Sequence, residues 1–370
     1  MQRRELLKYS AGLALTGLVS RAPAAATALQ DALDDTLLLS AASDRAGGHY
    51  LCGQYLDGTL AFALPVSERA HACQYRPHTA DAVFFSRRPG HYLHIVDTEL
   101  GELKHSIKSL PGYHYYGHGV YSADGARLYT TENDASSARG VIGIYAADQH
   151  YRRIGEWDLQ GTGPHELAWL PGTDTLAVAL GGILTALDSE RSKLNLDTMQ
   201  PALLLVDSQR GSIEGRWRPP HHQLSLRHLA VNSGGEVIVG AQYQGPASDA
   251  RPLVFRLADG KFGPLRAAPD DWQRQHQYIA SVAVDPEQRY ALTTSPRGGV
   301  VSLWDLRADT VRHHALADVA GAHWCERARG FLVTNGYGEI ARLQPDHPDA
   351  LERLFMQTRL RWDNHLQVSA

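Results

Sequence analysis

His118-Gly-Val-Tyr-Ser-Ala-Asp-Gly125 opens the clearest structural pattern in this 370-residue chain. The run Arg127-Leu-Tyr-Thr-Thr131 follows it. Apolar and polar residues alternate on both sides of an Asp-Gly turn, which is typical of an antiparallel β-hairpin. Related hairpins begin at His165, His228, Ser281 and His323. Self-similarity of this kind indicates a repeat architecture.

A further β-rich segment recurs along the chain and usually ends in a polar residue. Its seven copies are Leu60–Leu64, Tyr92–Asp97, Val141–Tyr145, Ala202–Asp207, Pro252–Arg256, Val300–Asp305 and Glu339–Leu343. Seven units average about 50 residues each, close to the roughly 40–50 residues of propeller blades. We therefore predict an all-β, seven-bladed β-propeller of the WD40/YVTN-like kind. The spacing argues against a pair of β-sandwiches, and one short helix is expected near Pro348–Met356.

The two ends of the predicted propeller complement each other. Trp362–Val368 resembles an inner strand with no hairpin after it, whereas Leu37–Ala41 and Tyr50–Gln54 lack an inner strand before them. Pairing them would complete one blade and hide two exposed sheet edges. Residues 29–370 are thus predicted to form a single domain that is closed by its N- and C-terminal strands.

Residues 1–28 are typical of an export signal. Arg3-Arg4 precede an apolar run over residues 11–19, and small residues then offer several A-x-A cleavage sites. Paired arginines before a modest apolar core favour a twin-arginine signal over an ordinary secretory one. The apolar run is too short to span a bilayer. We expect a periplasmic protein with no membrane span after cleavage.

Composition narrows the functional classes. The chain has 36 basic and 40 acidic residues and a formal net charge of -4, which gives no case for nucleic-acid binding. Three cysteines allow at most one disulfide, with Cys52–Cys73 as one choice. No C-x-x-C, phosphate-loop, dinucleotide or nucleophile-elbow motif is present, so no reaction is named by the sequence.

Histidines recur at one position of the repeat. Those that begin a predicted inner strand are His118, His165, His228, His323 and His365. Because inner strands surround the channel of a propeller, we expect these five imidazoles to face a common axis. Neutral imidazole is a common ligand of Cu, Zn, Fe and Ni. Two blades break the pattern: one carries Tyr278-Ile-Ala-Ser281, and in the blade near Asp81 the nearest histidine is His78.

Charged and polar residues accompany these histidines. Glu166 follows His165, and Glu132 ends the strand after His118, so both carboxylates are predicted as further metal ligands. Because the mixed donor set suits both Fe and Cu, either is a candidate. The residues predicted to line the rim are Asn133, Asn195, Arg227, Arg297 and Tyr278.

Two other interpretations of the histidines stay open. A histidine in each repeat can simply hydrogen-bond a strand end, as the Gly-His element of WD40 repeats does. Alternatively, the site takes an anion, for which Arg297 on the Gly-rich turn Ser295–Gly299 offers a cation.

Several segments together resemble domain of unknown function 1513, from roughly residue 45 to the end. These segments are Gly117–Val120, Thr130–Asp134, Gly163–Glu166, Lys193–Thr198, Arg227–Ala230, Thr294–Gly299 and Trp362–His365. The resemblance implies an exported seven-bladed propeller similar in shape to the quinoprotein amine dehydrogenase chain. It also implies genes beside imelysin-like and di-haem peroxidase-like proteins in iron-responsive clusters. His323 lies outside these motifs.

The sequence thus leads to three functional hypotheses. The first is an accessory, non-enzymatic role in iron or other metal acquisition, with imelysin-like and di-haem peroxidase-like proteins as partners. The second is a docking scaffold for uptake partners. The third is a quinone- or metal-dependent oxidoreductase in which Glu166 beside a metal acts as a general base.

Overall fold

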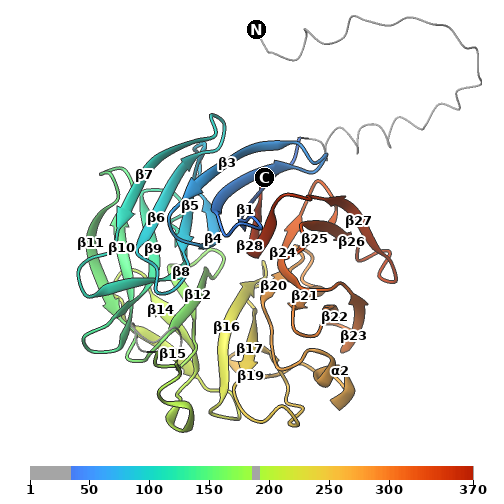
Figure 1. Ribbon diagram of the computed structural model, residues 1–370. Helices are drawn as coiled ribbons and strands as arrows, with labels where there is room; N and C mark the ends of the chain where they lie inside the picture. The colour runs from blue at the N-terminus through green and yellow to red at the C-terminus, as the bar shows by residue number, and fades with distance from the viewer. Residues whose placement is uncertain (1–34, 186–191, 370) are drawn as a thin grey trace, which may run out of the picture.

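The computed structural model describes residues 35–185 and 192–369, so the predicted signal peptide of residues 1–28 lies outside the described residues. Seven four-stranded antiparallel sheets stand around a central axis, which confirms the predicted seven-bladed β-propeller (Figure 1). Within the described ranges, no helix is both long enough and apolar enough to cross a membrane.

Six blades each use four consecutive strands, ordered from the channel outward. The first two are β4 (Ala70–Tyr75), β5 (Asp81–Ser86), β6 (Tyr92–Asp97) and β7 (Glu102–Lys108), then β8 (Tyr113–Tyr121), β9 (Arg127–Asp134), β10 (Arg139–Ala146) and β11 (Arg152–Asp158). The next two are β12 (Pro164–Trp169), β13 (Thr175–Leu180), β14 (Ala202–Asp207) and β15 (Ile213–Trp217), then β16 (Leu224–Val231), β17 (Val237–Tyr243), β18 (Val254–Ala258) and β19 (Lys261–Pro264). The last two are β20 (Ser281–Val284), β21 (Tyr290–Ser295), β22 (Val300–Asp305) and β23 (Thr310–Ala315), then β24 (Val319–Cys325), β25 (Gly330–Asn335), β26 (Glu339–Leu343) and β27 (Leu351–Met356).

The seventh blade joins the two ends of the chain. Its strands, from the channel outward, are β28 (Arg361–Val368), β1 (Leu37–Ser43), β2 (His49–Tyr55) and β3 (Leu60–Val66). β28 pairs antiparallel with β1, and Ser40 Oγ donates a hydrogen bond of 2.7 Å to the carbonyl of His365. The predicted closure is therefore confirmed. The inner strand of this blade comes from the C-terminal end, so the three N-terminal strands occupy its second, third and fourth positions. Leu60–Leu64 therefore lies in the outermost strand, whereas the other six copies of its repeat lie in the third strand of their blades.

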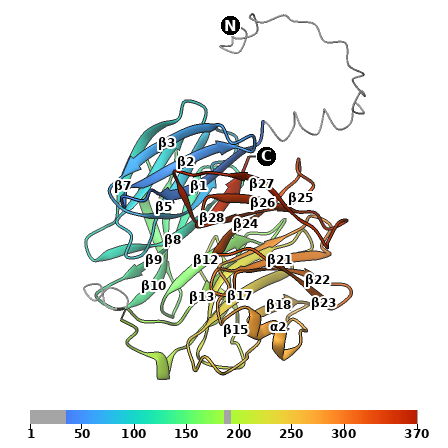
Figure 2. The same ribbon diagram turned by 45° about the vertical axis from the view of Figure 1, so that its right-hand side comes forward.

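The hydrophobic core lies between the faces of neighbouring sheets. Leu39 and Leu51 of the closing blade pack with Phe84 and Val96 of the next blade, and similar apolar clusters follow around the ring. Figure 2 shows neighbouring sheets stacked around the channel. Removal of this apolar surface from water is the main force that stabilises the ring.

Helical structure is confined to short segments. The described residues include a 3-10 turn, η2 (Leu196–Thr198), and one α-helix, α2 (Pro269–Arg274). The expected helix near Pro348–Met356 is wrong, because Leu351–Met356 forms the outer strand β27. The backbone of β26 offers this segment a row of hydrogen-bond partners, and pairing overrides its helix-forming composition.

The three cysteines are all free and buried, so the suggested Cys52–Cys73 disulfide is wrong. Burial raises the pKa of the Cys52 thiol to about 12, because the thiolate would lose its hydration. These side chains pack as small apolar groups and take no part in the site described next.

Candidate functional site

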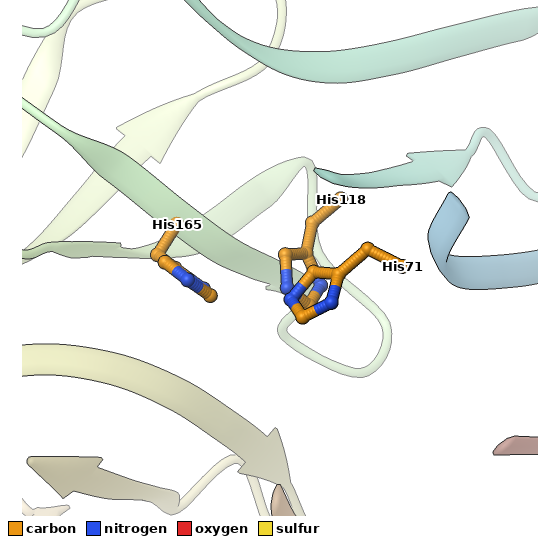
Figure 3. Close-up of side chains that lie close together, drawn as sticks. All are labelled: His71, His118 and His165. Atoms are coloured by element: carbon orange, nitrogen blue, oxygen red, sulfur yellow. The ribbon is translucent and has the colours of Figure 1, made fainter. Parts of the chain in front are cut away.

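Five imidazoles meet in the central channel, each from a different inner strand. This histidine cluster consists of His71 on β4, His118 on β8, His165 on β12, His228 on β16 and His365 on β28. The closest ring centroids, such as those of His71 and His365, are 4.6 Å apart, and those of His71 and His228 are 6.4 Å apart. Figure 3 shows three members converging from neighbouring strands.

A β-bulge places each of these side chains in the channel. The pairing of β4 with β5 shifts between Ala70 and Cys73, on either side of His71. Comparable shifts occur around His118, His165 and His365 and immediately before His228. A bulge inserts extra residues into one strand and re-aims their side chains. The register of β20 shows no such shift, and this strand carries no histidine.

Four of the five expected histidines belong to the cluster, whereas His323 lies outside it. His323 pairs in regular register with Leu332, and its Nδ1 lies 2.6 Å from the carbonyl oxygen of Trp324. Bond formation with its own strand leaves this ring outside the cluster. The bulge of β24 lies instead at Ala320, which has no imidazole to present.

His71 takes the fifth place; sequence reasoning missed it and named only His78 as the nearest histidine of this blade. His78 lies in a turn between β4 and β5. A signal was available, because His71 precedes Pro77 by six residues, just as His165 precedes Pro171. The Ala-rich context of His71 and the lack of an Asp-Gly turn concealed the match.

Glycine makes room for His71. Gly117 has a φ of +94°, and a Cβ at this position would lie 2.7 Å from Cδ2 of His71. A side chain here would therefore both strain the backbone and displace the imidazole.

Glu166 connects two rings of the cluster. Its Oε2 lies 3.2 Å from Nδ1 of His228, and its Oε1 lies 3.8 Å from Nδ1 of His118. Oε2 also accepts a hydrogen bond of 3.0 Å from the backbone N–H of Leu229. A carboxylate on Nδ1 orients an imidazole so that Nε2 faces a ligand, as it does around metal sites.

The Nδ1 atoms of two further rings also have partners. Asp363 Oδ1 lies 3.4 Å from Nδ1 of His71, and Ser281 Oγ lies 3.0 Å from Nδ1 of His365. Ser281 thus supports the cluster from β20, the inner strand that lacks a histidine. Asp363 also pairs with Arg69.

Three ring nitrogens of the cluster have no partner within the described chain. Nε2 of His118, Nε2 of His365 and Nδ1 of His165 are buried without a hydrogen bond. Buried polar atoms in native proteins are nearly always satisfied, so orphaned nitrogens need an explanation. Two triads of ring nitrogens, His71/His118/His165 and His118/His228/His365, each lie within 4.8 Å of one another.

Electrostatics keeps the cluster neutral. Burial lowers the pKa of His228 and His365 to about 3, and it lowers the pKa of the other three well below 6.5. Nearby positive charge, including that on the other imidazoles when protonated, adds to this effect. Burial also raises the pKa of Glu166 to about 7. The imidazoles are therefore in the unprotonated form that metals bind.

The cluster lies between two cavities of the channel. On one side, a cavity of about 390 Å³ is lined by Glu166, His118, His323 and His365, among others. On the other side, a cavity of about 180 Å³ has His71, His165 and His228 in its wall. We call this second cavity the basic vestibule, after its cations Arg87, Arg88, Lys193, Arg227 and Arg297.

Three of the predicted rim residues come together in the basic vestibule. Arg227, Arg297 and Tyr278 all line it, and the guanidinium of Arg297 lies 4.6 Å from the ring centroid of Tyr278. Asn195 is not among the residues that line it. Its side chain instead bonds the backbone of Leu184 and Gly182.

Glu132 and Asn133 lie on β9, away from the cluster. Glu132 accepts hydrogen bonds from Tyr145 at 2.7 Å and Arg153 at 3.0 Å, and it is 1% exposed. A Cβ on Gly143 would lie 1.9 Å from Glu132 Oε1, so this glycine makes room for the carboxylate. Glu132 is a buried ion-pair partner within its blade, and the structure does not bring it to the five imidazoles.

The family of the chain follows from its similarity to known proteins. No curated protein matches the chain. A model of the family described as "Protein of unknown function (DUF1513)" matches residues 64–369. The match covers most of the propeller and extends from β3 through the end of β28, which carries His365. The chain therefore belongs to the DUF1513 family, as its motifs predict.

Proposed function

We propose that the histidine cluster binds a divalent transition-metal ion and that the protein handles this metal as an accessory, non-enzymatic component of metal acquisition. The observation that carries the proposal is the set of buried, neutral imidazoles whose ring nitrogens form two triads, each within 4.8 Å of one another. Side chains that only fasten strand ends would have their nitrogens occupied by backbone, as His323 does. Here the unoccupied nitrogens of His118, His165 and His365 have no such partner among the described residues.

The geometry supports coordination after small side-chain movements. Two nitrogens bound to one zinc-like ion at about 2.1 Å can be at most about 4.2 Å apart. The nitrogens of both triads already lie within 4.8 Å of one another. Because His118 belongs to both triads, it is the ligand on which every three-histidine arrangement found in the described chain depends.

The donor chemistry favours borderline metals. Imidazole suits Cu, Zn, Fe and Ni, whereas Mg²⁺ and Ca²⁺ prefer oxygen ligands. Glu166 lies on the Nδ1 side of His118 and His228, where it supports those rings. Among divalent ions, Cu²⁺ should bind most tightly by the general order of affinities. The donor chemistry does not single out iron, and the link to iron comes from the family resemblance.

The cellular location and the partners of the protein are also part of the proposal. Arg3-Arg4 and the apolar run after them support export by the twin-arginine route to the periplasm. The family resemblance supports imelysin-like and di-haem peroxidase-like proteins as partners. Co-purification with such a partner tests this point, and persistence of the complex in His118→Ala would favour a docking scaffold over metal handling.

Metal loading tests the central claim. Protein stripped by a chelating resin is loaded with Cu²⁺, Zn²⁺ or anaerobic Fe²⁺, desalted and analysed by mass spectrometry of the metal. We expect about one equivalent in the wild type and at least a tenfold loss of affinity in His118→Ala. Less than about one tenth of an equivalent in the folded wild type would overturn the proposal.

Two controls separate the cluster from other histidines. His323→Ala removes a half-buried imidazole of the channel that lies outside the cluster. The double variant His221→Asn, His222→Asn removes a stacked pair that precedes β16 and belongs to neither triad. Both should load like the wild type, and a folded His118→Ala protein that also loads fully would assign the metal to another place.

A further inference from the structure

The basic vestibule gathers positive charge on its wall. Arg87, Arg88, Lys193, Arg227 and Arg297 line this cavity of about 180 Å³. None of the described residues that line it is acidic. All of these cations line the same cavity, and burial, followed by repulsion from Arg227, Arg297 and Arg88, lowers the pKa of Lys193.

Arg227 is the strongest indication of a ligand. It is only 4% exposed, and its Nε is buried with no hydrogen-bond partner in the described chain. A buried charge without a partner is among the most costly features that a fold can contain. Gly181 leaves room for this side chain, since a Cβ there would lie 3.3 Å from Nε of Arg227. The fold therefore accommodates the guanidinium at a cost to its own stability.

Arg88 is a second vestibule arginine with a nitrogen that has no partner among the described residues. Nη1 of Arg88 is buried without a partner, and its guanidinium carbon lies 5.4 Å from the ring centroid of Tyr116. Arg297 is placed over Tyr278 in the same way. Stacking on aromatic rings fixes the plane of a guanidinium and leaves its N–H groups free to bind. The vestibule thus offers preorganised donors rather than flexible surface cations.

We infer that the basic vestibule binds a small multivalent oxyanion, either a polycarboxylate or a phosphate. Carboxylate and phosphate groups are the partners that accept two parallel hydrogen bonds from guanidinium. An anion on Arg227 and Arg88 would satisfy their unpaired donors and neutralise the charge. His71, His165 and His228 belong to the same wall, so the anion would lie directly beside the histidine cluster. The inference goes beyond metal binding and does not depend on it.

Calorimetric titration of metal-free protein tests this inference. The protein is stripped with a chelating resin rather than a soluble polycarboxylate chelator, and the probes are citrate and inorganic phosphate at matched ionic strength, with chloride as reference. The variants are Arg227→Met and Arg88→Met, and the control is Arg152→Met, an exposed arginine that contacts Gln149 on another part of the ring.

We expect at least a tenfold loss of oxyanion affinity in both vestibule variants and none in the control. Arg227→Met should also raise the melting temperature of the free protein by about 2–4 °C, because it removes an unpaired buried charge. A merely structural arginine would lower it. Tighter binding of citrate identifies a polycarboxylate, and tighter binding of phosphate identifies a phosphate. No preference for either over chloride, or unchanged affinity in both variants, would overturn the inference whatever the result of metal loading.

Discussion

The inner strands that carry the cluster differ from β20 and β24 in their backbone. β4, β8, β12, β16 and β28 each have a register shift at the histidine, and β24 has its shift three residues before His323. β20 has none. His365 is buried and His323 is half-buried, and they lie on neighbouring inner strands, yet only His365 joins the cluster. The position of the bulge, rather than the presence of a histidine, decides which side chain enters the site.

The largest effect should follow from removal of β28. Deletion of residues 361–370 removes His365 and Asp363 and exposes the edge of β1. We expect loss of the cooperative thermal transition by circular dichroism, whereas deletion of Ala370 alone should leave it unchanged. A truncated protein that melts like the full chain would show that the six remaining inner strands are sufficient.

A matched pair of glycines isolates the contact with His71. Gly117 and Gly112 both have positive φ, but a Cβ on Gly112 would meet nothing within 4 Å. Gly112→Ala should cost about 1 kcal/mol of unfolding free energy through the backbone alone. Gly117→Ala should cost about 2–4 kcal/mol, because displacement of the imidazole is added. Urea denaturation measures both values, and equal costs would contradict the proposed close packing.

His114 is a buried imidazole on β8 that lies outside the cluster. Burial, followed by Arg88 and His91, lowers its pKa from 6.5 to about 4. Below pH 6.5 the unfolded chain therefore binds a proton that the folded protein does not, and stability falls as the pH drops toward 4. In His114→Gln the loss of stability between pH 7.5 and pH 5 should be smaller by about 1–2 kcal/mol. Denaturant curves at both pH values measure this difference, with exposed His347→Gln as the control.

The smallest effect is expected at His323. His323→Ala should leave metal stoichiometry and affinity unchanged, whereas His365→Ala should weaken binding about tenfold or more, because only His365 belongs to a triad. Loading experiments on the two folded variants make this comparison directly. Equal losses would mean that both rings reach the metal and that the bulge is irrelevant.

Much of the architecture could be predicted from local patterns. Alternating residues and recurrent turns identify the blades, and the unpaired segments Leu37–Ala41 and Trp362–Val368 identify the closure. The strand at Leu351–Met356 was harder to predict, because its residues alone favour a helix. They form a strand because they pair with the edge of β26. Such tertiary pairing has no local signature.

The site could be predicted only in part, because register shifts are not visible in the sequence. Repeat position selects His118, His165, His228 and His365 correctly, but the same rule also selects His323. His71 is missed because its turn lacks the usual glycine. Of the vestibule cations, Arg227 and Arg297 were predicted as rim residues, whereas Arg88 was missed because it lies in the loop after β5, in a different blade from Arg227.

Asp363 and His71 are 292 residues apart in sequence and meet only when β28 takes its place. The histidine cluster is thus complete only when β28 closes the ring. A chain that lacks β28 lacks a full set of imidazoles. Under the proposed metal-handling function, metal binding would therefore be restricted to closed rings.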